Sequence, residues 1–144
     1  MLNHVGFELK NKRINSSEIA ILDDIAKIDE MGINELIEVA NSLYREHNYS
    51  LAVEKIWDAF ERMKTYYGQD KKVSANKIID KLSNGDSVYK ELFEEEFHEL
   101  TRIGNAYCIR HHEKGKIPIE NELQYKYFYL RCYALISVVM DLLK

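Results

Sequence analysis

The sequence has little of the material from which tight turns are built. Its 144 residues include only one proline and six glycines. A many-stranded barrel or sandwich needs frequent turn residues, so this composition argues against both architectures. Hydrophobic residues make up 46% of the chain and charged residues 31%, proportions that are ordinary for a globular protein and argue against intrinsic disorder. A chain of this length is expected to form one domain with its own core.

Long apolar runs, a strong charge of one sign and a cysteine framework are missing as well. No segment near the start has the apolar run of a signal peptide, and the longest apolar stretch near the end, 133–140, is too short to span a bilayer. The formal net charge of −4 excludes coating of nucleic acid by bulk positive charge, but it permits a local basic patch. Cys108 and Cys132 lack metal-type spacing and are interpreted as small buried residues. We therefore expect a cytoplasmic protein that does not contact a membrane.

Hydrophobic residues recur at helical spacing from about residue 34 onward. The stripe from Leu51 to Tyr67, with Trp57 in its middle, is the strongest, and Gly68 stands where this helix is expected to end. Residues 116–119 are expected to be an extended connector, because their proline disfavours helix in the residue before it. The pattern predicts five helices in this part of the chain, over about 34–46, 51–67, 74–82, 86–113 and 122–143. The first is expected to begin at a cap at Asn34 and to end at a break at 47–48. The third is expected to begin at Ser74, and the fourth at Asp86 or Ser87.

The first thirty residues show a weaker pattern. Residues 2–9 suit a short strand or irregular chain, and residues 17–31 suit a short helix. We treat residues 1–30 as an N-terminal extension with a short helix and residues 31–144 as the domain itself. Four main helices plus one or two short helices, joined by short loops, predict an all-α bundle.

The densest polar cluster lies at the end of the predicted long helix. On a helix that continues through this region, Arg102, Asn105 and His112 share one stripe. Arg110 and His111 lie to either side of it. A histidine can exchange a proton near neutral pH, and an arginine can hold a phosphate through two hydrogen bonds. Arg, His and Asn on one face therefore suit phosphodiester cleavage, in which the histidine moves the proton and the arginine stabilises the charged transition state.

Simpler interpretations stand beside this one. Arg, His, Lys and Glu near a helix C-terminus are also the residues that the helix dipole favours at a solvated end. Lys126 and Arg131, among the tyrosines of the last helix, suit either a core-and-rim arrangement or a base-stacking surface. The glutamates 94–96 are interpreted as a solvated face. Because adjacent histidines point about 100° apart on a helix, His111 and His112 make a poor pair of metal ligands, and we expect no metal or cofactor.

Three segments of the sequence resemble a known family. The segments 52–65 (AVEKIWDAFERMKT), 103–113 and 127–131 (YFYLR) are similar to the C-terminal domains of bacterial abortive-infection proteins of the AbiJ type. These domains belong to the HEPN superfamily of small α-helical bundles, which often dimerise. Many members are metal-independent endoribonucleases of phage defence and toxin–antitoxin systems. The resemblance covers roughly residues 30–144 and implies a HEPN-like helical bundle.

The resemblance also implies a function and a site. It implies a metal-independent endoribonuclease that acts in phage defence or as a toxin, with a cleft across a homodimer in which Arg and His from both copies face each other. A histidine would act on the 2′-hydroxyl or the leaving oxygen, which selects RNA as the substrate. The implied residues are Arg110, His111, His112 and Asn105 for catalysis, and Arg102, Lys114 and Arg131 for substrate binding.

The spacing within this cluster leaves other hypotheses open. An active HEPN site usually has its histidine several residues after the arginine, whereas here Arg110 is followed at once by His111 and His112. The alternative is a non-catalytic HEPN-like module that dimerises or binds an RNA or protein partner with a degenerate Arg/His motif. A third hypothesis is an unrelated helical adaptor. Because the similar abortive-infection proteins usually carry a further N-terminal region, an antitoxin or sensor partner is also expected.

Overall fold

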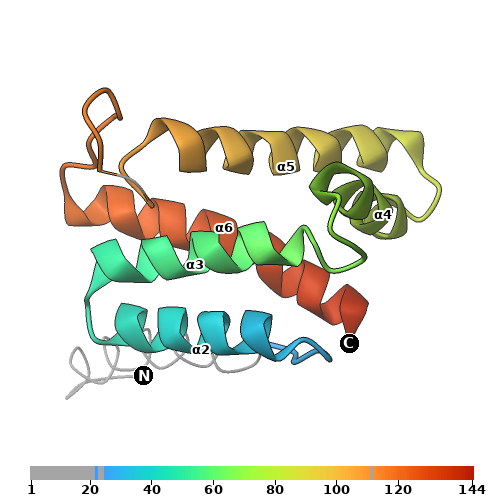
Figure 1. Ribbon diagram of the computed structural model, residues 1–144, viewed down its shortest axis with the longest axis horizontal. Coiled ribbons are helices and arrows are strands. Elements are labelled where there is room, and N and C mark those ends of the chain that lie inside the picture. Colours follow the sequence, from blue (N-terminus) through green and yellow to red (C-terminus); the bar gives the residue numbers. More distant parts are fainter. Residues whose placement is uncertain (1–21, 23–24, 111) are drawn as a thin grey trace, which may run out of the picture.

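The chain folds into a bundle of helices (Figure 1). The computed structural model describes residues 22, 25–110 and 112–144. Within this part there is no β-strand, only an isolated bridge between Tyr107 and Ile117, so the predicted all-α class is confirmed. No helix in these ranges is both long and apolar enough to cross a membrane. The helices are α2 (Met31–Arg45), α3 (Tyr49–Met63), α4 (Lys71–Ser83), α5 (Ser87–Ala106) and α6 (Glu122–Leu143).

Four of the helices begin at a side chain that accepts a hydrogen bond from a free N–H group of the first turn. The predicted start at Asn34 is wrong because the Asn34 side chain bonds both backbone groups of Ile28 instead. The predicted cap at Ser74 is also wrong, since its hydroxyl accepts from the backbone N–H of Tyr67. The observed caps are Glu30 for α2, Asp70 for α4, Asp86 for α5 and Asn121 for α6.

Two helices end earlier than the periodicity predicts. α3 ends at Met63, and residues 64–67 continue as turns. α5 ends at Ala106 rather than near residue 113, because Tyr107 adopts an extended backbone with φ −100° and ψ 164°. The N–H of Ile117 then donates to the carbonyl of Ala106, and the N–H of Cys108 donates to the carbonyl of Ile117. The connector 107–121 thus bonds to the end of α5 in place of a further helical turn.

The core is built around α3. This helix packs against both α2 and α6, while α4 packs against α5 (Figure 1). Trp57 is fully buried, and its indole Nε1 donates to the carbonyl of Leu100 on α5 at 2.9 Å. Cys132 is buried as predicted, but Cys108 is partly exposed because it lies in the connector rather than on a helix. The predicted strand over 2–9 lies outside the described residues, as does most of the predicted helix over 17–31, and residues 25–30 are not helical.

Candidate functional site

Among the described residues, the connector between α5 and α6 carries three of the predicted site residues, and none of these three is on a helix. Arg110, His112 and Lys114 all follow the end of α5 at Ala106. The predicted helical stripe that joins Arg102 and Asn105 to His112 is therefore wrong, because the backbone turns away at Tyr107. His111 lies outside the described residues. The side chains of His112 and Lys114 are exposed, but they lie on the connector and not at the C-terminus of α5.

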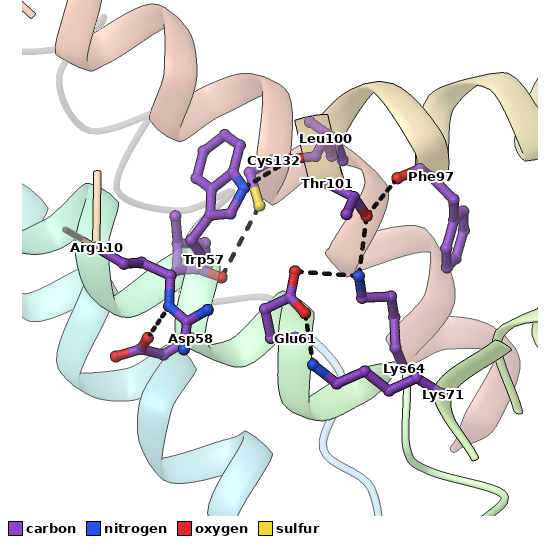
Figure 2. A network of polar contacts seen from close by, with 11 residues as sticks. Trp57, Asp58, Glu61, Lys64, Lys71, Phe97, Leu100, Thr101, Arg110 and Cys132 are labelled. Carbon is purple, nitrogen blue, oxygen red and sulfur yellow. Dashed lines mark hydrogen bonds and ion pairs between the residues drawn. The ribbon is translucent and has the colours of Figure 1, made fainter. Parts of the chain in front are cut away.

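Arg110 is held onto α3 by an ion pair. Its Nε donates to Oδ1 of Asp58 at 2.7 Å (Figure 2). The two side chains are 35% and 25% exposed, so the guanidinium is positioned yet still reachable from solvent. Ile109, one residue earlier, is buried in the core and anchors the connector at this point. Arg110 is therefore the connector residue of the predicted Arg/His cluster whose side chain is held in place by an ion pair.

Arg102 and Arg131, both predicted to bind substrate, are each paired with a carboxylate of the same chain. Arg102 reaches both carboxylate oxygens of Glu99, at 2.8 and 2.5 Å. Arg131 reaches both oxygens of Glu96, at 3.2 and 2.9 Å, so Glu96 is the partly buried, ion-paired edge of the predicted solvated face, on which Glu94 and Glu95 are exposed. The hydrogen bonds that Arg102 donates to Glu99 raise the pKa of Arg102, and those that Arg131 donates to Glu96 raise the pKa of Arg131.

Asn105 lies on the last turn of α5 with an exposed side chain. Its backbone carbonyl accepts a hydrogen bond from Nζ of Lys116 at 2.6 Å. A cation at this place satisfies one of the carbonyl groups that the helix end leaves free. The described contacts thus give Asn105 a role in ending α5, and they do not bring its side chain to Arg110.

A charge network that the sequence analysis did not single out lies beside the Arg110 pair (Figure 2). Nζ of Lys64 lies 3.0 Å from Oε2 of Glu61 and donates to Oγ1 of Thr101 at 2.9 Å. Lys71 donates from α4 to the other oxygen of Glu61 at 2.8 Å. Thr101 donates in turn to the carbonyl of Phe97 at 2.9 Å. The Glu61 carboxylate therefore joins α3 to α4, and Lys64, which directly follows α3, joins the end of that helix to α5.

Both ends of the Glu61–Lys64 pair are largely buried, with side-chain exposures of 15% and 9%. Burial lowers the pKa of Lys64, and the attraction of Glu61 opposes that shift. Burial would raise the pKa of Glu61, but hydrogen bonds and charge from Lys71 and Lys64 outweigh it and the pKa is lowered. Arg110 also lowers the pKa of Lys64, which places both cations in one electrostatic neighbourhood. The spacing of residues 58, 61 and 64 on one helix face is the sequence signal that could have indicated this network.

The described part of the chain holds no group of three or more His, Cys, Asp or Glu side chains that could bind a metal ion. Comparisons of the chain with protein-family models, with curated proteins and with solved structures found no match. The resemblance to the HEPN superfamily therefore stays a prediction.

Proposed function

We propose that the chain is a HEPN-like helical module that binds RNA through the connector between α5 and α6. The observation that carries this proposal is the partly exposed guanidinium of Arg110, which a phosphate can reach in competition with Asp58. Exposed His112 and Lys114 follow it on the same connector. In a chain of net charge −4, Arg110 and Lys114 bring two basic side chains onto one connector, where they can contact the phosphates of a nucleic acid.

The same geometry supports binding more than cleavage. A proton-transfer group has to lie within hydrogen-bond reach of the atom on which it acts, close to the group that stabilises the phosphate. Arg110 pairs with a carboxylate, and exposed His112 has no described partner to orient it. Arg102 and Arg131 also pair with carboxylates of the same chain. These contacts favour the non-catalytic alternative, in which the Arg/His motif is degenerate.

A second candidate is the metal-independent endoribonuclease of phage defence or a toxin–antitoxin pair. It is favoured by the placement of Arg110 and His112 two residues apart on one connector. A two-fold homodimer that apposed two connectors would set the arginine of one copy against the histidine of the other. The histidine would then move a proton and the arginine would stabilise the phosphate, both supplied by this chain.

Two assays on the same variants separate these candidates. The first measures the affinity of a fluorescent single-stranded RNA by anisotropy at low salt, and the second follows RNA cleavage on denaturing gels with excess EDTA. Arg110→Ala should weaken binding about tenfold, because it removes a charge-assisted hydrogen bond. Arg62→Ala is the matched control, since Arg62 also pairs with a carboxylate, Glu30. It should bind RNA like the wild type.

Each outcome of the two assays supports one candidate function or overturns both. Tight binding by the wild type, a loss for Arg110→Ala and no cleavage would support the RNA-binding module. Cleavage in EDTA that both Arg110→Ala and His112→Ala abolish, with the fold intact by circular dichroism, would establish the ribonuclease instead. A wild-type protein that neither binds nor cleaves RNA would overturn both candidates.

A further inference from the structure

A hollow of about 600 Å³ lies where the connector meets the first turns of α6. Its wall is mainly aromatic and apolar, and the connector contributes Tyr107 and Ile117 while α6 contributes Leu123, Tyr127 and Phe128. The ring centroids of Tyr107 and Phe128 are 5.1 Å apart, and those of Tyr127 and Phe128 are 5.7 Å apart. A concave, mostly apolar site with a few polar groups is the usual form of a ligand pocket.

Three of the wall residues are exposed to an extent that folding alone does not explain. Tyr127 is 57% exposed, Leu123 76% and Ile117 46%. Apolar surface gathered in one hollow marks a binding site more often than scattered surface residues do. Since the structure leaves one aromatic face of α6 open to solvent beside the hollow, a flat apolar group is the natural occupant.

Beside the acidic Glu120, side-chain amides supply the polar groups of the wall. The Oε1 atom of Gln124 accepts from the backbone N–H of Glu120 at 2.7 Å. The Oδ1 atom of Asn121 accepts from the backbone N–H of Gln124 at 3.0 Å. Both amide oxygens are therefore used by the backbone, which leaves the NH₂ groups to donate. A ligand with carbonyl or ring-nitrogen acceptors at its edge fits this donor set.

Two arginines stand beside the tyrosines of the hollow. Arg131 donates from Nη1 to the hydroxyl of Tyr127 at 3.3 Å. Arg102 lies close enough to Tyr107 for that hydroxyl to add to the raised pKa of Arg102. The Arg102 side chain is 49% exposed and that of Arg131 is 27% exposed. Both guanidiniums are already paired with carboxylates of α5, Glu99 and Glu96, and neither arginine lines the hollow, so contacts to phosphate are left to the connector.

We propose that this hollow binds one nucleobase, which stacks on Tyr127 and is contacted at its edge by the Gln124 and Asn121 amides. This inference rests on the proposed function, because it places one base of the RNA whose phosphates contact the connector. Aromatic stacking accepts every base and contributes about 1–3 kcal/mol per base. A base within single-stranded RNA and a free nucleotide offer the same stacking face and the same edge acceptors. Binding of an RNA strand and binding of a free nucleotide are therefore measured separately.

The experiment compares a single-stranded RNA with an oligonucleotide of the same length that has the ribose-phosphate backbone without bases. Tyr127→Ala should weaken binding of the RNA about tenfold and leave binding of the abasic strand unchanged. Tyr127→Phe, which keeps the ring, should bind the RNA within about twofold of the wild type. Val138→Ala is the control, because Val138 is also exposed on α6, at 49%, but does not line the hollow.

Failure of this inference is distinguishable from failure of the proposed function. If Arg110→Ala weakens RNA binding while Tyr127→Ala does not, the base site is overturned and the RNA-binding function stands. If the wild type binds no RNA, saturable binding of adenosine or uridine monophosphate that Tyr127→Ala abolishes would support the hollow as a free-nucleotide site, and no binding would overturn it. A change from dimer to monomer in Tyr127→Ala, measured by light scattering, would also overturn it by showing that the hollow is a self-interface.

Discussion

The indole of Trp57 on α3 lies directly against Gly104, so that this side chain packs on the backbone of α5. A Cβ atom added to residue 104 would lie 2.6 Å from Cδ1 and 2.7 Å from Nε1 of Trp57. The same Nε1 donates to the carbonyl of Leu100, one turn earlier on α5, at 2.9 Å. This contact fixes α5 against the core just before the helix ends, and so it fixes the starting point of the connector.

The close approach predicts that Gly104→Ala is destabilising. Alanine favours a helix by about 1 kcal/mol over glycine, but here its methyl group would overlap the indole and force Trp57 or α5 to move. We expect a net loss of about 1–3 kcal/mol in the free energy of unfolding, measured by urea denaturation. Asn105→Ala, a substitution at the next and exposed position, should change stability by less than about 0.5 kcal/mol. Equal stabilities for Gly104→Ala and the wild type would contradict the observed packing.

The shared carboxylate of Glu61 predicts a second loss of stability. Glu61→Gln keeps the shape of the side chain but removes the charge that compensates Lys64 and Lys71. Because the Lys64 side chain is only 9% exposed, its ammonium group would remain largely desolvated without a counter-ion. We expect a cost of about 1–3 kcal/mol at pH 7, measured by urea denaturation. Glu95→Gln is the matched control, because Glu95 is exposed on α5.

This cost should also depend on pH. The pKa of Glu61 is lowered in the folded state from an ordinary value of 4.5, so the folded state binds its proton less readily than the unfolded state. The contribution is therefore fully present above pH 4.5 and is lost as the pH falls through the lowered folded-state pKa. The stability difference between the wild type and Glu61→Gln should shrink at low pH. A difference that stays constant to pH 3 would show that the charge is not its cause.

The buried stripe of α3 could be predicted from the sequence, whereas the end of α5 could not. Trp57 recurs with its apolar neighbours at helical spacing, and that spacing reports burial on one face of a helix. The same spacing continues past Ala106 to Ile109, which is also buried. Ile109, however, reaches the core from a bend in the connector, next to Cys108, whose N–H donates to the carbonyl of Ile117. Apolar periodicity alone does not distinguish a buried residue on a helix from one on a connector that passes over the core.

The ion-pair partners of the predicted site residues could not be predicted from the sequence either. Arg110 and Asp58 are separated by 52 positions in the sequence, and Arg131 and Glu96 by 35. Each carboxylate was visible only as a charge on a helix, and its partner depends on how α3, the connector, α5 and α6 pack. Residue types therefore located the cationic cluster, but only the tertiary structure shows that these arginines are already paired.

The Arg110–Asp58 pair predicts the effect of removing its carboxylate on RNA binding. Asp58 competes with a phosphate for the same guanidinium, so Asp58→Asn should bind single-stranded RNA more tightly, by about twofold to fivefold at low salt. The cost in stability should stay below about 1 kcal/mol, because the pair is partly solvated. The double variant with Arg110→Ala should lose the gain. A loss of affinity in Asp58→Asn with an intact fold would mean instead that Asp58 positions the guanidinium for the phosphate.

The two thiols should differ sharply in reactivity. Cys132 is 0% exposed, and burial raises its pKa well above the ordinary value, so its thiolate is scarce and inaccessible. Cys108 lies partly exposed on the connector. Iodoacetamide at pH 8 should alkylate Cys108 in the native protein and Cys132 only after unfolding in urea, as peptide mass spectrometry would show. Native Cys108→Ser should remain unlabelled over the same time. Labelling of Cys132 at the rate of Cys108 would mean that α6 opens from α3 far more often than its packing implies.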